Sequence, residues 1–202
     1  WREDLAKVRV EATASQKVMR VQEDADHTHT EIQAWLRDLG TALGFLPYIA
    51  ANDRTRPWQE GLLGDGCASP PDLPEAMPGI DMVRLIDVLW LSPENLRVEA
   101  AFEVEHTTSI YSGILRMLDL SLGHEASGFS GLFLVAPDNR EEDVRRQLAR
   151  PAFRRGADLH LRYLPYSELS ENRDQIARFG SGLKPMYAVA RDLPGAPVAA
   201  PG

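Results

Sequence analysis

The 202-residue chain has few cysteines and no long apolar run. Its one cysteine, Cys67, cannot form an internal disulfide, which favours a reducing, cytoplasmic setting. No segment approaches the ~20 apolar residues that cross a bilayer, and no signal peptide is present, so we expect no membrane partner. The chain begins at Trp1 with charged, helix-forming sequence, from which we expect a further region of the same protein to precede it.

Positive charge is also scarce, because 22 Lys and Arg face 30 Asp and Glu, for a formal net charge of −8. This balance argues against a free-standing, non-specific nucleic-acid binder, since phosphate contacts require cations. It does not exclude an enzyme acting on nucleic acid, because acids that ligate a metal do not repel the substrate once the metal is bound. The low aromatic content argues against a sugar-binding groove, and hence against a glycosidase built on paired carboxylates.

Three acids are embedded in otherwise apolar sequence. Glu103 and Glu105 are two residues apart in a predicted strand, so their side chains point to the same face. Asp87 lies in a second apolar segment, and the turn residues 92–95 predict that the two strands, 82–90 and 97–105, form a hairpin. We therefore expect Asp87 beside Glu103 and Glu105, as a site for a hard divalent cation.

Two helices are predicted before this hairpin, over residues 1–23 and 30–44, with a polar break between them. Thr28 and Glu31 fit a capping box at the start of the second helix. His27 and His29 resemble a metal cluster when taken with Glu31, but no further Cys or His lies at zinc-ligand spacing, which disfavours structural zinc.

The remaining elements alternate between strands and helices. Thr107, Thr108 and Ser109 predict the N-cap of a helix whose start would face the acidic strand and suit a phosphate group. The other predicted elements are an edge strand over 45–50, a long loop over 51–80, helices over 110–122, 141–149 and 167–179, and strands over 131–137 and 159–164. We predict a helical arm or linker over 1–26, a domain over 27–190 and a disordered tail over 191–202.

This pattern resembles the PD-(D/E)XK nuclease superfamily over about residues 28–165. Asp87 takes the position of the first acid and Glu103 that of the second, sixteen residues later. Ile86 replaces the usual proline and Glu105 the usual lysine, which makes this a Glu-x-Glu variant. The resemblance implies an α/β restriction-endonuclease-like fold, with a mixed central sheet flanked by helices.

The resemblance also implies an activity, which is Mg²⁺-dependent endonucleolytic cleavage of DNA in a restriction or defence role. Asp87, Glu103 and the carbonyl of Val104 would hold Mg²⁺, with Mn²⁺ as a substitute, while Glu105 would act as a base or hold a second metal. Glu31 would reach the metal through water. The substrate phosphate would lie near a polar residue of the following helix: Tyr111, Ser112 or Arg116.

Two questions stay open, namely the oligomeric state and whether the domain is catalytically active. The expected partner is DNA, and a homodimer would allow two sites to cut two strands. The alternative is a catalytically inactive DNA-binding or interaction domain of the same fold. In that case the acids would be neutralised by nearby arginines such as Arg84 or Arg97.

Overall fold

The structure is a computed structural model that describes residues 2–69, 80–106, 110–123, 130–150, 153 and 160–193. Within the first helix, the described side chains are those of Val18, Val21 and the residues from Glu23 onward. The predicted N-cap at 107–109 and residues 194–202 of the predicted tail lie outside the described residues.

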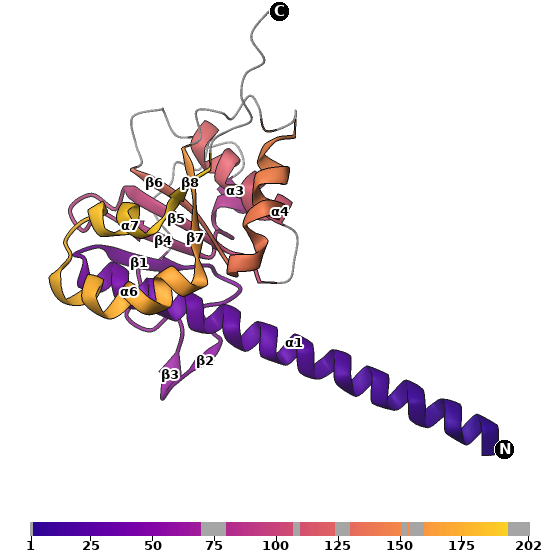
Figure 1. Ribbon diagram of the computed structural model, residues 1–202. Helices are drawn as coiled ribbons and strands as arrows, with labels where there is room; N and C mark the ends of the chain where they lie inside the picture. The colour runs from indigo at the N-terminus through magenta and orange to yellow at the C-terminus, as the bar shows by residue number, and fades with distance from the viewer. Residues whose placement is uncertain are drawn as a thin grey trace, which may run out of the picture.

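Helix α1 runs without interruption over Arg2–Ala42, and its N-terminal part projects from the domain (Figure 1). The predicted break over 23–30 and the capping box of Thr28 and Glu31 are therefore wrong. The hydroxyls of Thr28 and Thr30 each donate to the carbonyl oxygen four residues earlier, on Asp24 and Asp26. These bonds satisfy the hydroxyls inside a helix, so the polar residues do not end it.

A six-stranded mixed sheet forms the centre of the domain, in the order β1-β4-β5-β6-β7-β8. The pairs β1–β4, β4–β5 and β7–β8 are antiparallel, whereas β5, β6 and β7 run parallel. The bounds are Leu46–Ile49 for β1, Val88–Leu91 for β4, Val98–Val104 for β5, Gly131–Ala136 for β6, Leu161–Pro165 for β7 and Arg191–Asp192 for β8. This confirms the predicted mixed sheet, the hairpin and the edge position of the first strand.

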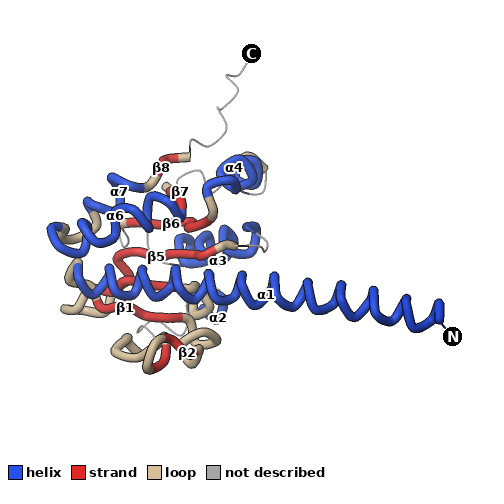
Figure 2. The backbone as a smooth tube through the Cα atoms, turned by 60° about the horizontal axis from the view of Figure 1, so that its bottom comes forward, coloured by secondary structure: helices blue, strands red, loops and turns tan. Residues whose placement is uncertain are grey.

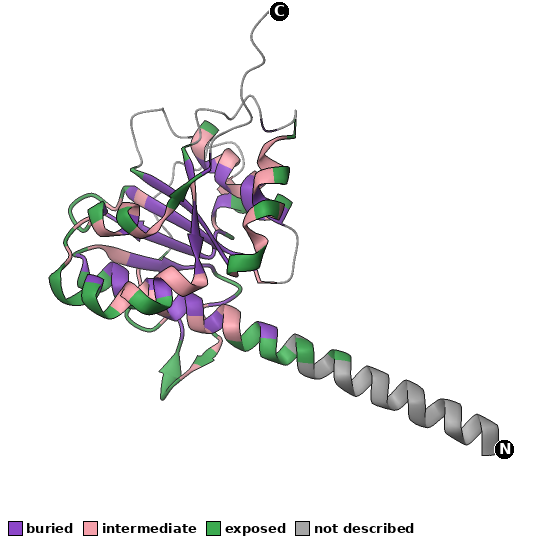
Figure 3. Ribbon diagram, in the orientation of Figure 1, coloured by how far each residue is buried: buried purple, intermediate pink, exposed green. Residues whose placement is uncertain are grey.

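Helices cover both faces of the sheet (Figure 2). One apolar core lies between the sheet and the first set of helices, α2 (Ile80–Val83), α3 (Ile110–Gly123) and α4 (Glu141–Leu148), the last preceded by the 3-10 turn η1 (Asp138–Arg140). The second core lies under α1, α6 (Tyr166–Phe179) and α7 (Lys184–Val189). The strands between the two cores are almost entirely buried, which is the restriction-endonuclease-like arrangement expected (Figure 3).

Three local predictions differ from the structure. Residues 80–83 form helix α2 and a turn follows, so the strand predicted over 82–90 begins only at Val88, where pairing with both Ile49 and Phe102 becomes available. The loop over 51–80 contains a two-stranded ribbon, β2 (Pro57–Trp58) with β3 (Gly61–Leu62). Residues 191 and 192 pair with β7, so this part of the predicted disordered tail is ordered.

The described helices include none that is both long and apolar enough to cross a membrane.

Candidate functional site

Asp87 immediately precedes strand β4, and its hydrogen bonds connect it to Ala50 and to strand β5. Its backbone carbonyl accepts a hydrogen bond from the Ala50 N–H at 3.2 Å, and its Oδ2 accepts the Val104 N–H at 2.7 Å. The carboxylate thus replaces a backbone acceptor at the point where β4 no longer pairs with β5. This contact fixes the buried Asp87 against the peptide that follows Glu103.

Glu103 and Glu105 lie under helix α3, on one face of the sheet. A Cβ added to Gly113 of α3 would be 2.9 Å from Oε1 of Glu105 and 3.3 Å from Cβ of Glu103. The two carboxylates are 0% and 3% exposed, respectively. The predicted convergence of Glu103 and Glu105 on one face is therefore seen, and the absence of a side chain at Gly113 lets the helix approach them.

Arg116 neutralises the more buried of these acids. Its Nε donates to Oε1 of Glu103 at 2.7 Å and its Nη2 to Oε2 at 2.5 Å, a bidentate pair. Burial and the charge of Asp87 raise the pKa of Glu103 well above its ordinary value, against the opposing effect of Arg116. The same pair raises the pKa of Arg116, so the guanidinium stays charged.

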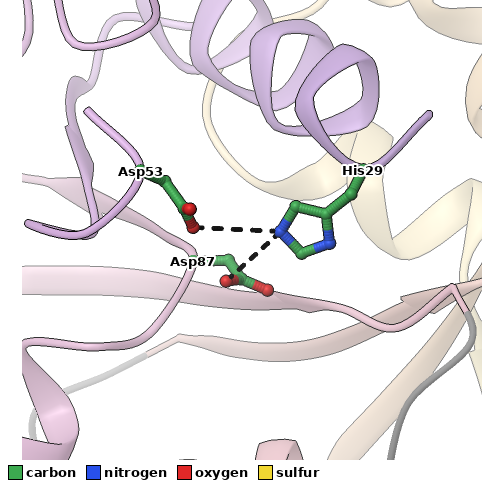
Figure 4. Close-up of side chains that lie close together, drawn as sticks. All are labelled: His29, Asp53 and Asp87. Atoms are coloured by element: carbon green, nitrogen blue, oxygen red, sulfur yellow. Dashed lines mark ion pairs between the residues drawn. The ribbon is translucent and has the colours of Figure 1, made fainter. Parts of the chain in front are cut away.

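The other side of Asp87 faces helix α1 and holds a second cluster. Nε2 of His29 lies 3.6 Å from Oδ1 of Asp87 and 3.9 Å from Oδ2 of Asp53 (Figure 4). Among the described residues, these three form the one set of His, Cys or acidic side chains whose ligand atoms all lie within 4.8 Å of one another. Such a group could hold a metal ion, whereas the predicted group of Asp87, Glu103 and Glu105 does not meet this distance criterion.

Further donors orient this second cluster. Arg56 Nε donates to Oδ1 of Asp53 at 2.7 Å, and the fully buried Gln33 donates through Nε2 to Oδ2 of Asp53 at 2.9 Å. Burial lowers the pKa of His29, but the hydrogen bond and charge of Asp87, with the charge of Asp53, outweigh it and raise that pKa above 6.5.

Tyr166 and His106 line the same end of the sheet from the α6 side. Their rings stack with centroids 5.9 Å apart, so His106 points away from Glu105, as strand alternation predicts. The Tyr166 hydroxyl is buried without a hydrogen-bond partner among the described residues. Burial, followed by the charges of Asp87 and Glu105, raises the pKa of Tyr166, which places this hydroxyl in the field of both acids.

Two of the other predicted site residues have partners of their own. Tyr111 packs its ring on Phe153 at 5.3 Å, and Arg116 is held by Glu103. Glu31 is two residues from His29, or about 200° around the helix, so it faces a different direction. Ser112, the remaining predicted substrate contact, lies half-buried on the first turn of α3. The predicted role of the Val104 carbonyl as a metal ligand stays a prediction.

Sequence reasoning missed Asp53, Gln33 and Tyr166 as members of this site, and it considered His29 only together with His27 and Glu31. A continuous helix places His29 and Gln33 on one face at i, i+4 spacing, but the predicted break concealed this relation. Tyr166 follows strand β7, which runs parallel to β6 and β5, so the carboxyl ends of these strands lie at the same end of the sheet. The order of the strands could therefore have indicated that Tyr166 lies near the acids. Asp53 lies in a loop, and no sequence pattern marks it.

We call His29, Asp53 and Asp87 the α1 cluster. A surface pocket of about 510 Å³ lies beside this cluster, between α1 and the β2–β3 ribbon. Arg56, the partner of Asp53, is part of its wall. The other lining residues are Asp26, His27, Thr30, Pro57, Trp58 and Gln59.

Comparisons with known proteins give one family. The family model described as the C-terminal domain of the Type II restriction enzyme NmeDI matches residues 9–185. The Type II restriction enzyme NmeDI of Neisseria meningitidis serogroup C is 29% identical over 154 residues, which cover 73% of this chain and 43% of that enzyme. The matched region thus spans less than half of the relative's length. No solved structure matches the chain.

Proposed function

Because the chain belongs to the family of the Type II restriction enzyme NmeDI C-terminal domain, we propose that it cleaves DNA as part of a restriction endonuclease. Asp87, Glu103 and Glu105 would form its hydrolytic centre. The observation that carries this proposal is the burial of all three carboxylates at one end of the sheet, beside the bidentate pair of Glu103 with Arg116. Burying acids in this way is costly unless cations compensate them, which favours a functional reason for the cluster.

The donors of this centre are oxygens, the ligand type that a hard cation prefers. Asp87, Glu103 and the Val104 carbonyl would hold Mg²⁺, with Mn²⁺ as a substitute. Each carboxylate oxygen has two lone pairs, so Glu103 can keep its bonds to Arg116 and still face a cation. When bound, Mg²⁺ polarises the scissile phosphate and lowers the pKa of the attacking water.

The protein groups around the centre have separate tasks. Glu105, in place of the usual lysine, would accept the proton of the attacking water as a general base. Arg116 balances the charge of Glu103 and holds its carboxylate in one orientation. The hydroxyl of Tyr166 lacks a partner among the described residues and can donate to a phosphate oxygen.

Cleavage of modified and unmodified plasmid and phage DNA, by the protein at its full encoded length with Mg²⁺ or Mn²⁺, tests this function. We expect Asp87→Asn and Glu103→Gln each to reduce cleavage by about 100-fold or more, since each removes a charge from the centre. Glu99→Gln is the matched control, because Glu99 lies on the same strand but pairs with Ser130 at the far end. Equal cleavage by wild type and Glu103→Gln would contradict the proposal.

The second candidate is a non-catalytic binding domain, which the Glu103–Arg116 pair favours. Both oxygens of Glu103 already accept from a cation of the protein, and position 105 carries no lysine. Under the nuclease proposal, Mg²⁺ raises the thermal midpoint of wild type more than that of Glu103→Gln. Equal shifts for the two proteins, together with no cleavage of any DNA, would favour the binding domain.

A further inference from the structure

The cluster on the α1 side of Asp87 has the composition and geometry of a metal site in its own right. We infer that His29, Asp53 and Asp87 bind one divalent transition-metal ion, of the Mn²⁺ or Zn²⁺ class, separately from the Asp87–Glu103 centre proposed above. The inference concerns metal binding by this side alone, and it does not depend on DNA cleavage.

The distances between the ligand atoms are close to those of a metal site. Nε2 of His29 is 3.6 Å from Oδ1 of Asp87 and 3.9 Å from Oδ2 of Asp53. Ligands at about 2.1 Å from a tetrahedral metal are separated by about 3.4 Å. The two distances from His29 exceed this value by a few tenths of an ångström, and the aspartate oxygens lie within 4.8 Å of each other, so a contraction of the cluster would place all three atoms around one ion.

Neighbouring groups already hold the oxygens that would not face the ion. The Val104 N–H binds Oδ2 of Asp87 and leaves Oδ1 towards His29. Arg56 binds Oδ1 of Asp53 and leaves Oδ2 towards His29. Hydrogen bonds of this kind orient the ligands of protein metal sites, and here two ligands from different segments are turned to the same imidazole nitrogen.

Gln33 provides an independent indication that a polar ligand binds between His29 and Asp53. Its side chain is 0% exposed and its Nε2 donates to Oδ2 of Asp53, the oxygen that faces His29. Its Oε1 is buried and has no hydrogen-bond partner among the described residues. A water bound to an ion between His29 and Asp53 would supply the missing donor, because metal-bound water donates strongly to nearby oxygens.

The donor set determines the class of ion. One imidazole nitrogen with two carboxylates favours Zn²⁺ or Mn²⁺, whereas Mg²⁺ and Ca²⁺ prefer oxygen ligands alone. Three protein ligands leave at least one coordination position for water or an exogenous ligand. The competing interpretation is an imidazolium of His29 that pairs with both aspartates, with no ion bound.

Metal titration separates the two interpretations. The Glu103→Gln variant at full encoded length is titrated with Mn²⁺, Zn²⁺ and Mg²⁺ by isothermal calorimetry, since this variant weakens the Asp87–Glu103 centre and leaves the α1 side intact. We expect one Mn²⁺ or Zn²⁺ per chain, bound at least tenfold more tightly than Mg²⁺. The bound Mn²⁺ should show magnetic coupling to an imidazole nitrogen in pulsed electron paramagnetic resonance.

Variants on the α1 side complete the test. His29→Ala and Asp53→Asn, each added to Glu103→Gln, should weaken Mn²⁺ binding at least tenfold, and His29→Ala should remove the nitrogen coupling. His27→Ala is the matched control, as an exposed histidine on the same helix that packs on Trp58, and should bind as its parent does. Circular dichroism checks that each variant folds.

Three outcomes would overturn the inference: no Mn²⁺ or Zn²⁺ bound by Glu103→Gln, unchanged affinity after both α1-side substitutions, or no coupling to nitrogen. These outcomes are distinct from failure of the proposed function, because Glu103→Gln can lose DNA cleavage while it keeps Mn²⁺. Wild type that binds Mn²⁺ where Glu103→Gln does not would place the ion at the Asp87–Glu103 centre alone.

Discussion

The buried carboxylates on the two sides of Asp87 are compensated by different positive groups. On the α3 side, the acids are closed off from solvent, and a guanidinium that stays charged is fixed to Glu103. On the α1 side, Asp53 and Asp87 face a histidine, and Arg56 connects the cluster to the pocket beside it. An arginine cannot give up its charge in a protein, whereas a neutral imidazole is itself a metal ligand.

This difference indicates on which side one positively charged partner can be replaced by another. The compensation on the α3 side is built into the fold, so its disruption should reduce stability. The compensation on the α1 side can be a proton or a metal ion, so its disruption should alter ligand binding more than stability. Substitutions on each side can separate these two behaviours.

The largest effect should follow loss of the fixed cation. Arg116→Met leaves Glu103 buried without its bidentate partner, and removing one member of a buried ion pair costs about 3 kcal/mol or more. We expect that loss in the free energy of unfolding, measured by urea denaturation at pH 7. Arg116→Met in a Glu103→Gln background should lose much less, because the neutral amide needs no counter-charge.

The stability of Arg116→Met should also depend on pH. The hydrogen bonds and the charge of Arg116 oppose the rise in the pKa of Glu103, so the loss of Arg116 favours the protonated carboxyl in the folded state. The unfolded chain releases this proton near pH 4.5, whereas the folded chain retains it. Glu103 of folded wild type also keeps its proton above pH 4.5, so the stability of Arg116→Met should fall relative to wild type only once the pH passes the raised pKa of Glu103 in folded wild type. A difference between the two proteins that stays constant through the pH range in which Glu103 of wild type ionises would contradict this.

The next effect concerns Gln33 on the α1 side. Gln33→Met removes a donor from Asp53, and loss of a group that orients a metal ligand lowers metal affinity by about 10-fold or more. Calorimetric titration with Mn²⁺ in the Glu103→Gln background measures this change, and Leu36→Met controls for a methionine on the buried face of the same helix. An affinity equal to that of the Glu103→Gln parent would show that Gln33 does not orient Asp53.

Much of the fold could be predicted because its strands are short, apolar and buried on both faces. The hairpin of β4 and β5, strand β6 and helices α3, α4 and α6 follow from such local patterns. The break in α1 was a wrong prediction, since Thr28 and Thr30 bond back to the helix and do not start a new one. Strand β4 begins late because pairing, which local sequence does not specify, begins at Val88.

The candidate site was predictable on one side only. Glu103 and Glu105 share a strand, so alternation places them on one face, and the hairpin places Asp87 near enough for its charge to raise the pKa of Glu103. The α1 cluster joins His29 and Asp53 from a helix and a loop, 24 residues apart in sequence, and only the tertiary structure brings them to Asp87. Arg116 was predicted near a phosphate from its place on α3, but the pattern could not show that it binds Glu103.

The smallest effect tests how closely α3 covers the acids. Gly113→Ala would place Cβ 2.9 Å from Oε1 of Glu105 and 3.3 Å from Cβ of Glu103, so the carboxylate or the helix must shift. Alanine favours a helix by about 1 kcal/mol over glycine, whereas overpacking costs about 1–3 kcal/mol, for a net loss of about 1 kcal/mol. Thermal or urea denaturation measures this loss. In a Glu105→Ala background the nearest atom is absent, so the penalty should shrink or reverse, and an unchanged penalty would place the strain elsewhere in the contact between α3 and β5.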